Sequence, residues 1–453
     1  METRKRKSKL EDSDTIDKRN KSSKILEKIF SDIEDKAVDQ VSKPTINKKK
    51  SVDKNEKSQI NLENTHKEVV KNIDGTSNWK KIESVIFKNY GSIPSEKILG
   101  LDLDDTLIVR ISGAKFAKDK YDWRFFINVE TVKKAISKYH NEGYRIVIFS
   151  NQKGISKGTT DENEWKQKID DIAVKLGIPL LVMAAVESDY YRKPSIGMWK
   201  LLENEVDEKK NKLDPKSFLF VGDAAGRLKN YEGKKDFSDS DHKFAINIGG
   251  KFETPEQFFL GQNSTVPKKF SFNPQDYKSE KHDEKDFNIN DKQQEMVIFV
   301  GSPGSGKTSF YSSYFSNYIH INNDTLKSAV KCLKGSEETL ASGKSVVIDN
   351  TNPTKAVRSS YISLAGKYKI PVRCFYFKYT KGLVFHLNNL RDINIGRKHH
   401  SKSVPDVVIH TWFKNLEEPS LAEGFKEIKV IPFVPGPFEN PLDEEIFYMH
   451  SAN

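Results

Sequence analysis

Cysteine is scarce in this sequence, and long apolar runs are missing. The 453 residues include two cysteines, Cys332 and Cys374, without the spacing of a metal site. Two lone thiols are typical of a reducing compartment and exclude a disulfide framework. No apolar run approaches the roughly 18 residues that a membrane helix needs, and the first residues lack the core of a signal peptide. We therefore expect a soluble intracellular protein without a membrane partner.

Hydrophobic side chains are also few. They make up 36% of the chain, whereas charged residues make up 31%, so part of the chain is expected to stay unpacked. Residues 1–75 mix lysine, serine, acidic residues and asparagine with few aromatics, which predicts a disordered basic and polar tail. Its clusters Arg4–Lys7 and Lys48–Lys50 could be a nuclear address, a nucleic-acid tether or simply solvated charge.

Apolar segments alternate with helical patterns in two parts of the chain. A first domain over 78–260 has predicted strands at 97–101, 144–149 and 217–221. A second domain over 293–453 has predicted strands at 296–300, 345–348 and 372–377. The polar, lysine-rich stretch 261–292 is the predicted linker. Strands that alternate with helices favour parallel sheets flanked by helices, whose sites form beyond the carboxyl ends of the strands. We therefore predict two α/β domains.

Acidic residues follow the first predicted strand. Asp102 and Asp104 are two apart in an extended segment, so both carboxylates face the same side. One carboxylate can attack phosphorus, and its neighbour can protonate the leaving oxygen. Asp223, after the third predicted strand, is a natural further oxygen ligand for magnesium. Taken alone, such an acidic string also occurs in turns, Lys193 could be a surface lysine, and Ser150 could cap a strand end.

The second half holds a glycine loop directly after a predicted strand. The loop consists of Gly301, Ser302, Pro303, Gly304, Ser305, Gly306, Lys307 and Thr308. The glycines let backbone N–H groups close around phosphate oxygens, and the following helix start adds positive potential. Lys307 would reach the β- and γ-phosphates of ATP, and the Thr308 hydroxyl would ligate magnesium. This pattern after a strand predicts triphosphate binding.

Residues downstream of the loop are candidates for the rest of a kinase site. Asp324 could take the proton from an acceptor hydroxyl, or it could cap a helix N-terminus. Asp349 ends an apolar strand and is similar to the second acidic motif of small kinases. Arg391 or Arg397 could stabilise charge on the transferring phosphate, or either could lie on a solvated helix face.

The motifs of the first half resemble those of the haloacid-dehalogenase-like phosphatases, in the same order. The resemblance implies that Asp102 is the nucleophile and Asp104 the general acid. It also implies that Ser150 and Lys193 bind the phosphate, and that Asp223, together with Asp102 and Asp104, ligates magnesium.

Further segments narrow this resemblance to the polynucleotide 3′-phosphatase branch. They are 150–155, 191–194, 221–227, 234–238 and the strand-like 244–249. Asp236 and Asp241 could support the metal site or be solvated, and both rank below Asp223. Asp105 stands where the wider family usually has glycine, and we expect its side chain to point to solvent.

The second half resembles the kinase domain of the bifunctional polynucleotide phosphatase/kinase enzymes. Segments 301–308, 323–326, 349–353, 388–391 and 421–425 carry this resemblance. The spacing before Arg391 is compressed relative to the family. Larger members have an N-terminal phosphothreonine-binding module, for which residues 1–75 are too few and too unpatterned, so recruitment through such a module is not expected.

These resemblances imply an end-healing enzyme of strand-break repair that uses Mg²⁺ and ATP. It would remove a 3′-phosphate through an aspartyl-phosphate and transfer the γ-phosphate of ATP to a 5′-hydroxyl. A net charge of +11 and a pI near 9.1 favour a nucleic-acid partner, with DNA the first choice. We expect a nuclear monomer whose tail could contact repair proteins. A fused phosphatase and kinase for small metabolites, and a non-catalytic scaffold that binds DNA ends, are the alternatives.

Overall fold

The computed structural model describes residues 78–204, 206, 212–230, 232–270, 272–278, 293–393 and 402–451. The predicted tail over 1–75 lies outside the described residues, as do Arg397 and residues 279–292 of the predicted linker. Within the described part, one sheet has seven strands and a second has five. Each sheet belongs to one of the two parts of the chain in which strands and helices were predicted to alternate.

The first sheet is mostly parallel and has the order β1-β2-β7-β6-β3-β8-β9. Its strands are β1 (Lys80–Ile82), β2 (Val85–Tyr90), β3 (Ile98–Leu101), β6 (Arg145–Asn151), β7 (Leu180–Ala185), β8 (Leu219–Val221) and β9 (Lys251–Glu253). Strands β7, β6, β3, β8 and β9 run parallel, whereas β2 pairs antiparallel with β1 and β7. A small hairpin of β4 (Ile108–Val109) and β5 (Arg124–Phe125) follows β3.

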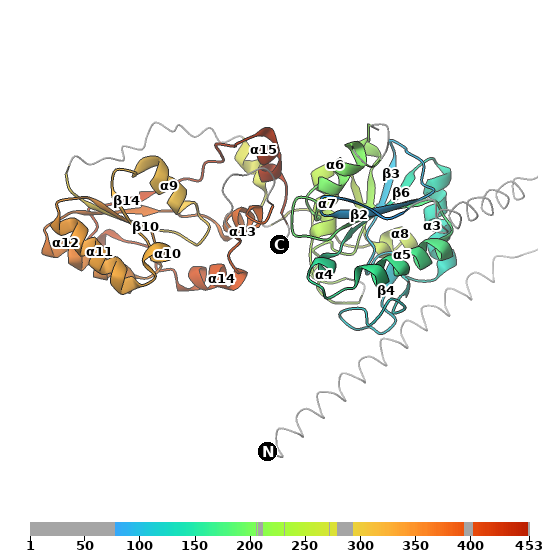
Figure 1. Ribbon diagram of the computed structural model, residues 1–453, viewed down its shortest axis with the longest axis horizontal. Coiled ribbons are helices and arrows are strands. Elements are labelled where there is room, and N and C mark those ends of the chain that lie inside the picture. The colour runs from blue at the N-terminus through green and yellow to red at the C-terminus, as the bar shows by residue number, and fades with distance from the viewer. Residues whose placement is uncertain are drawn as a thin grey trace, which may run out of the picture. The chain divides into compact units, whose positions relative to one another are not determined.

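Helices cover both faces of this sheet (Figure 1). Its helices are α3 (Val129–Asn141), α4 (Lys153–Ser156), α5 (Glu162–Leu176), α6 (Gly197–Asn204), α7 (Ser240–Ile248) and α8 (Pro255–Leu260). Leu99 and Leu101 pack in the cluster that contains residues of α3, α5 and α8. Ile98 points to the other face, in the cluster with residues of α6 and α7. Because both faces are buried, the central strands are continuous apolar runs.

The second sheet is fully parallel and has the order β11-β12-β10-β13-β14. Its strands are β10 (Met296–Val300), β11 (Ile319–Ile321), β12 (Val346–Ile348), β13 (Val372–Tyr376) and β14 (Glu427–Val430). The helices of this part are α9 (Lys307–Tyr314), α10 (Asn323–Leu326), α11 (Ala329–Ala341), α12 (Lys355–Lys367), α13 (Lys381–Leu390), α14 (Asp406–Asn415) and α15 (Pro441–Tyr448). One face packs aliphatic residues against α11 and α12, and the other packs phenylalanines such as Phe299, Phe315 and Phe375.

The predicted fold class is confirmed, but one predicted strand is wrong. Residues 244–249 belong to helix α7 and its C-cap, where Phe244 and Ala245 are buried and Ile246 is 38% exposed. Gly249 ends the helix in the left-handed conformation, with φ of 90°. A short apolar run does not distinguish a strand from a buried helix, because both bury most of their side chains.

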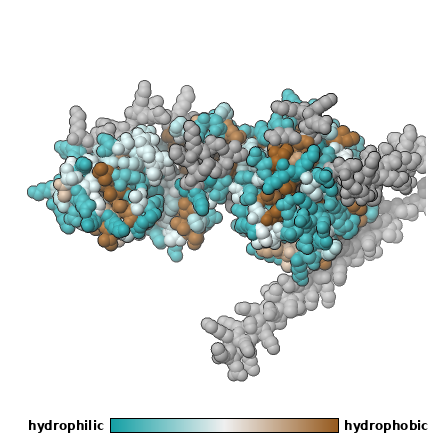
Figure 2. Space-filling model, in the orientation of Figure 1, coloured by the Kyte–Doolittle hydropathy of each residue, from teal (hydrophilic) through white to brown (hydrophobic). Residues whose placement is uncertain are grey.

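The face of the molecule drawn in Figure 2 is largely hydrophilic. Figure 2 shows hydrophilic residues over most of the visible face, with scattered hydrophobic patches between them. Across the described ranges, no helix is both long enough and apolar enough to span a membrane.

Candidate active sites

The first candidate site lies at the carboxyl edge of the seven-stranded sheet. Asp102 follows β3 directly, Ser150 lies near the end of β6, and Asp223 lies two residues beyond β8. Because β6, β3 and β8 are parallel neighbours, their ends bring these side chains to the same edge. The backbone N–H of Asp102 also donates to the carbonyl of Val221 at 2.8 Å, which ties two of the strand ends together.

Lys193 is the charged centre of this site. Its ammonium lies 2.6 Å from Asp102 Oδ1 and 2.7 Å from Asp241 Oδ1, and its side chain is 1% exposed. One carboxylate oxygen each from Asp102, Asp223 and Asp241 lie within 4.8 Å of one another. Buried carboxylate oxygens at this spacing fit a hard divalent cation such as magnesium. Asp102 and Asp223 were predicted as ligands, and the structure adds Asp241 to them.

Burial dominates the electrostatics of the cluster. It raises the pKa of Asp102 to about 7, although the neighbouring ammonium of Lys193 opposes the rise. Burial, followed by the charges of Asp241 and Asp102, raises the pKa of Asp223. For Lys193, burial alone would lower the pKa, but the two bonded carboxylates outweigh it and raise the pKa. Crowded carboxylates with raised pKa values are stabilised by an added cation.

A residue without a predicted role, Gln152, connects Asp104 and Ser150. Gln152 Nε2 donates to Asp104 Oδ2 at 2.7 Å and to Ser150 Oγ at 2.9 Å. Lys168, from α5, places its ammonium 3.8 Å from the other oxygen of Asp104. Both groups hold the Asp104 carboxyl in place. Lys168 lies in a helix far from any motif, so no local pattern indicates it.

The absence of a side chain at Gly222 lets Asp241 reach the carboxylate cluster. A Cβ atom at Gly222 would lie 2.4 Å from Asp241 Oδ2, so any other residue would push the carboxylate away. Asp241 also accepts the backbone N–H of Ala224 at 3.1 Å. Ranking Asp241 below Asp223 was therefore an underestimate. The glycine before Asp223 was the available signal, since it marks a close approach of another chain segment.

Two other acidic residues depart from their predicted surroundings. Asp236 is buried in a salt bridge with Arg227 at 2.8 Å, so it is neither solvated nor part of the carboxylate cluster. Asp105 does not simply point to solvent, because Arg110 Nη2 donates to both of its carboxylate oxygens, at 2.9 and 2.7 Å. Its backbone is in the left-handed region, with φ of 59°.

The second candidate site is the glycine loop after β10. Gly304 and Gly306 have φ of 82° and 80°, which residues with a Cβ rarely adopt. A Cβ at Gly301 would lie 2.8 Å from Ser305 Oγ and 2.9 Å from Phe377 Cβ. The loop is therefore shaped by its glycines into a cradle of backbone N–H groups, which fits the phosphates of ATP.

Lys307 lies inside this cradle at the start of α9. Its ammonium donates to the carbonyls of Gly301 at 3.1 Å and Ser302 at 2.7 Å. Burial lowers its pKa to about 8; the charge of Asp349 opposes this shift and that of Arg391 adds to it. A buried ammonium with a lowered pKa gains strongly from a nearby anion, so this position favours phosphate.

A chain of polar contacts connects the loop to β12 and β11. Thr308 Oγ1 donates to Asp349 Oδ2 at 2.7 Å, and His320 Nε2 lies 2.9 Å from the same oxygen. The His320 ring stacks on Tyr311, with centroids 3.9 Å apart and planes 10° apart. Thr308 and Asp349 are the pair that would hold magnesium with a triphosphate. The sequence did not indicate His320, because its role depends on a stack between α9 and β11.

Asp324 and Arg391, the two predicted residues of the kinase chemistry outside the loop, both act electrostatically on Lys307. Asp324 is exposed in α10, and the N-cap of that helix is Asn322, whose side chain accepts from Thr325 N. The alternative that Asp324 caps the helix is therefore wrong. Arg391 follows α13, and a Cβ built on Gly304 would lie 3.9 Å from its guanidinium. The structure thus brings Arg391 to the glycine loop.

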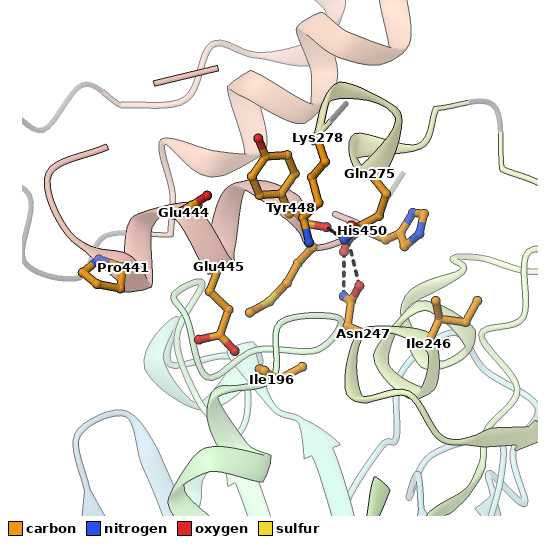
Figure 3. A pocket seen from close by; sticks show the side chains of 11 residues that line it. Ile196, Ile246, Asn247, Gln275, Lys278, Pro441, Glu444, Glu445, Tyr448 and His450 are labelled. Atoms are coloured by element: carbon orange, nitrogen blue, oxygen red, sulfur yellow. Dashed lines mark hydrogen bonds between the residues drawn. The ribbon is translucent and has the colours of Figure 1, made fainter. Parts of the chain in front are cut away.

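A cavity of about 550 Å³ is lined by residues other than those predicted for the two sites (Figure 3). Figure 3 shows Asn247 hydrogen-bonded to His450, with Glu444, Glu445, Tyr448 and Lys278 around them. None of the predicted site residues lines this cavity. The site residues instead lie at the two sheet edges and the glycine loop.

The folds and sites together define a haloacid-dehalogenase-like phosphatase domain followed by a P-loop kinase domain. Residues 97–259 match the family model "Polynucleotide kinase 3 phosphatase", and residues 296–419 match an AAA domain. A bifunctional polynucleotide phosphatase/kinase of Schizosaccharomyces pombe is 35% identical over 78% of this chain and 84% of its own length. A putative enzyme of the same name from Acanthamoeba polyphaga mimivirus is 35% identical over 74% and 85%. The chain belongs to the bifunctional polynucleotide phosphatase/kinase family.

A third relative matches a smaller part of this chain. The polynucleotide 3′-phosphatase of Arabidopsis thaliana is 32% identical over 42% of this chain and 28% of its own length.

Proposed function

We propose that this chain repairs the ends of broken nucleic-acid strands, hydrolysing a 3′-phosphate at the first site and phosphorylating a 5′-hydroxyl at the second. The observation that supports it best is the presence of two separate phosphate sites in one chain of this family. One site is built around buried carboxylates and Lys193, and the other is a glycine loop around Lys307. The products, a 3′-hydroxyl and a 5′-phosphate, are the ends that a ligase joins.

In the phosphatase domain, Asp102 is the proposed nucleophile. Its carboxylate oxygen attacks the terminal phosphorus, and the bond from phosphorus to the 3′-oxygen breaks. Asp104, held by Gln152, gives a proton to that leaving oxygen, then takes one from the water that hydrolyses the aspartyl-phosphate. Ser150 and Lys193 bind the phosphate oxygens. Net reaction consumes one water and releases inorganic phosphate.

Asp102, Asp223 and Asp241 are the proposed holders of magnesium in this domain, with Asp104 a predicted further ligand. When bound, the ion would neutralise charge on the phosphate and on the attacking carboxylate. The fit rests on three carboxylate oxygens within 4.8 Å of one another. In the kinase domain, Thr308 and Asp349 would hold the ion that accompanies ATP.

In the kinase domain, Asp324 is the proposed general base. It takes the proton from the 5′-hydroxyl, whose oxygen then attacks the γ-phosphorus of ATP, and ADP leaves. Lys307 binds the β- and γ-phosphates, while Arg391, beside the loop, stabilises charge on the group in transfer. DNA is the proposed substrate and the nucleus the proposed compartment, since the net charge of +11 favours a polyanion.

One reaction tests both halves. The protein is incubated with magnesium, ATP and a nicked duplex that has a 3′-phosphate and a 5′-hydroxyl, and both termini are then analysed. We expect a 3′-hydroxyl and a 5′-phosphate. Turnover of sugar phosphates with no change at either terminus would instead support the small-metabolite alternative, and no turnover of any substrate would support the scaffold.

A further inference from the structure

The segment after β3 presents three acidic residues, each beside a different cation. Asp102 contacts Lys193 at 2.6 Å, Asp104 lies 3.8 Å from Lys168, and Asp105 contacts Arg110 at 2.7 Å. The proposed mechanism uses Lys193, and Lys168 supports the proposed general acid. The third pair, Asp105 with Arg110, has no part in that chemistry.

The three cations differ in their exposure. The side chain of Lys193 is 1% exposed, that of Lys168 is 9% exposed, and that of Arg110 is 25% exposed. The three cations therefore become more exposed to solvent in the order Lys193, Lys168, Arg110. A nucleic-acid end has a matching order of charges, because its terminal phosphate must enter while the next phosphodiester stays farther out.

The residue that holds Arg110 in place, Asp105, has an unfavourable backbone conformation. Asp105 adopts φ of 59°, an uncommon conformation for a residue other than glycine. In this conformation both of its carboxylate oxygens accept from Arg110 Nη2 alone. Nε and Nη1 of the guanidinium are not used in the pair, so they can donate to a phosphate.

The carboxylates at the site act electrostatically on Arg110. Burial would lower its pKa, but the hydrogen bond and charge of Asp105, with Asp104 and Asp223 after them, raise it. The backbone bridge between Asp104 and Ile108 brings this segment back beside the acidic motif. Arg110 follows the hairpin strand β4 directly, which fixes its position relative to Asp104.

We propose that Arg110 binds the phosphodiester adjacent to the terminal 3′-phosphate and thereby makes the phosphatase site prefer a polynucleotide end over a mononucleotide. This inference rests on the proposed function, because it assumes a nucleic-acid 3′-phosphate as substrate. Asp105 is the positioning residue that aims the guanidinium.

The test compares two substrates that share the reacting bond. Steady-state kinetics of the full chain are measured on a 3′-phosphorylated oligonucleotide and on thymidine 3′-phosphate, which lacks a phosphodiester. For Arg110→Ala we expect KM on the oligonucleotide to rise about tenfold, with kcat within about twofold of wild type, because one charged hydrogen-bonded contact is lost. On thymidine 3′-phosphate we expect kcat/KM to stay unchanged. The slope of log KM against log salt concentration should fall by about one, because one phosphate contact is lost.

Arg124→Ala is the matched control. Arg124 lies in β5 of the same hairpin, is exposed, and donates to the carbonyls of Phe125, Phe126 and Ile127. The Arg124→Ala substitution removes the same charge as Arg110→Ala without affecting the proposed contact. The kinetic constants for both substrates should therefore match those of the wild type. Arg110→Gln serves as a second variant if the thermal unfolding transition of Arg110→Ala shows that the first domain is no longer folded as in wild type.

Two outcomes would overturn the inference. An equal loss on both substrates would mean that Arg110 supports Asp104 or the local fold, and no change on either would mean that the pair is only a surface ion pair. If the wild type itself released no phosphate from the oligonucleotide but hydrolysed thymidine 3′-phosphate, the proposed function would fail instead.

Discussion

The two candidate sites handle the same chemical group but are built differently. At the phosphatase site, charged side chains from the segments after β3, β7 and β8 and from α7 meet at one sheet edge, where Lys193 pairs with Asp102 and Asp241. At the kinase site, a single loop of eight residues supplies the cradle, and its glycines set the backbone shape. The first depends on a balance of buried charges and the second on backbone shape.

Because the two sites are built differently, they are sensitive to different substitutions. Removing one charge from the phosphatase cluster leaves a buried charge with one partner fewer, which is costly. Removing a side chain from the glycine loop leaves the backbone cradle in place. Each domain has a hydrophobic cluster made of its own residues, so changes in one site should leave the other nearly unaffected.

Asp102→Asn should have the largest effect. An amide cannot form the aspartyl-phosphate, so we expect 3′-phosphate release to fall by more than about 10³-fold while 5′-phosphorylation stays within about twofold. The measurement follows both termini of a nicked duplex. Loss of both activities would show that the two sites are not independent.

Lys307→Ala should reverse this pattern. We expect phosphorylation of a 5′-hydroxyl to fall by about 10²- to 10³-fold, since a charge aimed at the transferring phosphate is removed. Release of 3′-phosphate should be unchanged, and the thermal unfolding of the variant compared with wild type is the control for folding. A variant that still phosphorylated at the wild-type rate would remove Lys307 from the proposed site.

Asp241→Asn tests whether the phosphatase site is a balanced network. It removes one of two carboxylates bonded to Lys193 and one of three proposed magnesium ligands. We expect kcat/KM for 3′-phosphate release to fall about 10- to 100-fold, with half-saturation at a higher magnesium concentration. Asp236→Asn, which alters a buried salt bridge outside the cluster, is the comparison. An unchanged magnesium titration for Asp241→Asn would exclude Asp241 as a ligand.

The pH dependence of ATP binding should show the smallest effect. Because burial lowers the pKa of Lys307 to about 8, its ammonium is charged below that pH and loses its proton above it. At pH 9 about one tenth remains charged, so ATP affinity should fall about tenfold between pH 7 and pH 9. Lys307→Arg keeps the charge and should flatten this dependence in a calorimetric titration. A fall of equal size in Lys307→Arg would assign the effect to another group.

The sequence predicted best what lies within one short segment. Strand β10 runs over Met296–Val300, as the apolar run indicated, and the loop after it has its left-handed glycines at Gly304 and Gly306. Such features depend on local sterics and on hydrophobic patterning, which the order of residues records directly. Segment 244–249 shows the limit, since its apolar residues fit a strand and the structure has a helix there.

The sequence alone determined the fold class of both domains, the family, and the residues at the ends of strands, because each follows from a contiguous motif. Which distant side chains join these strand-end residues depends on the tertiary structure. Asp241 enters the carboxylate cluster past Gly222, Gln152 links Asp104 to Ser150, and His320 reaches Asp349 by stacking on Tyr311. These contacts arise where separate elements pack together, and no local pattern of residues encodes the distance between two elements.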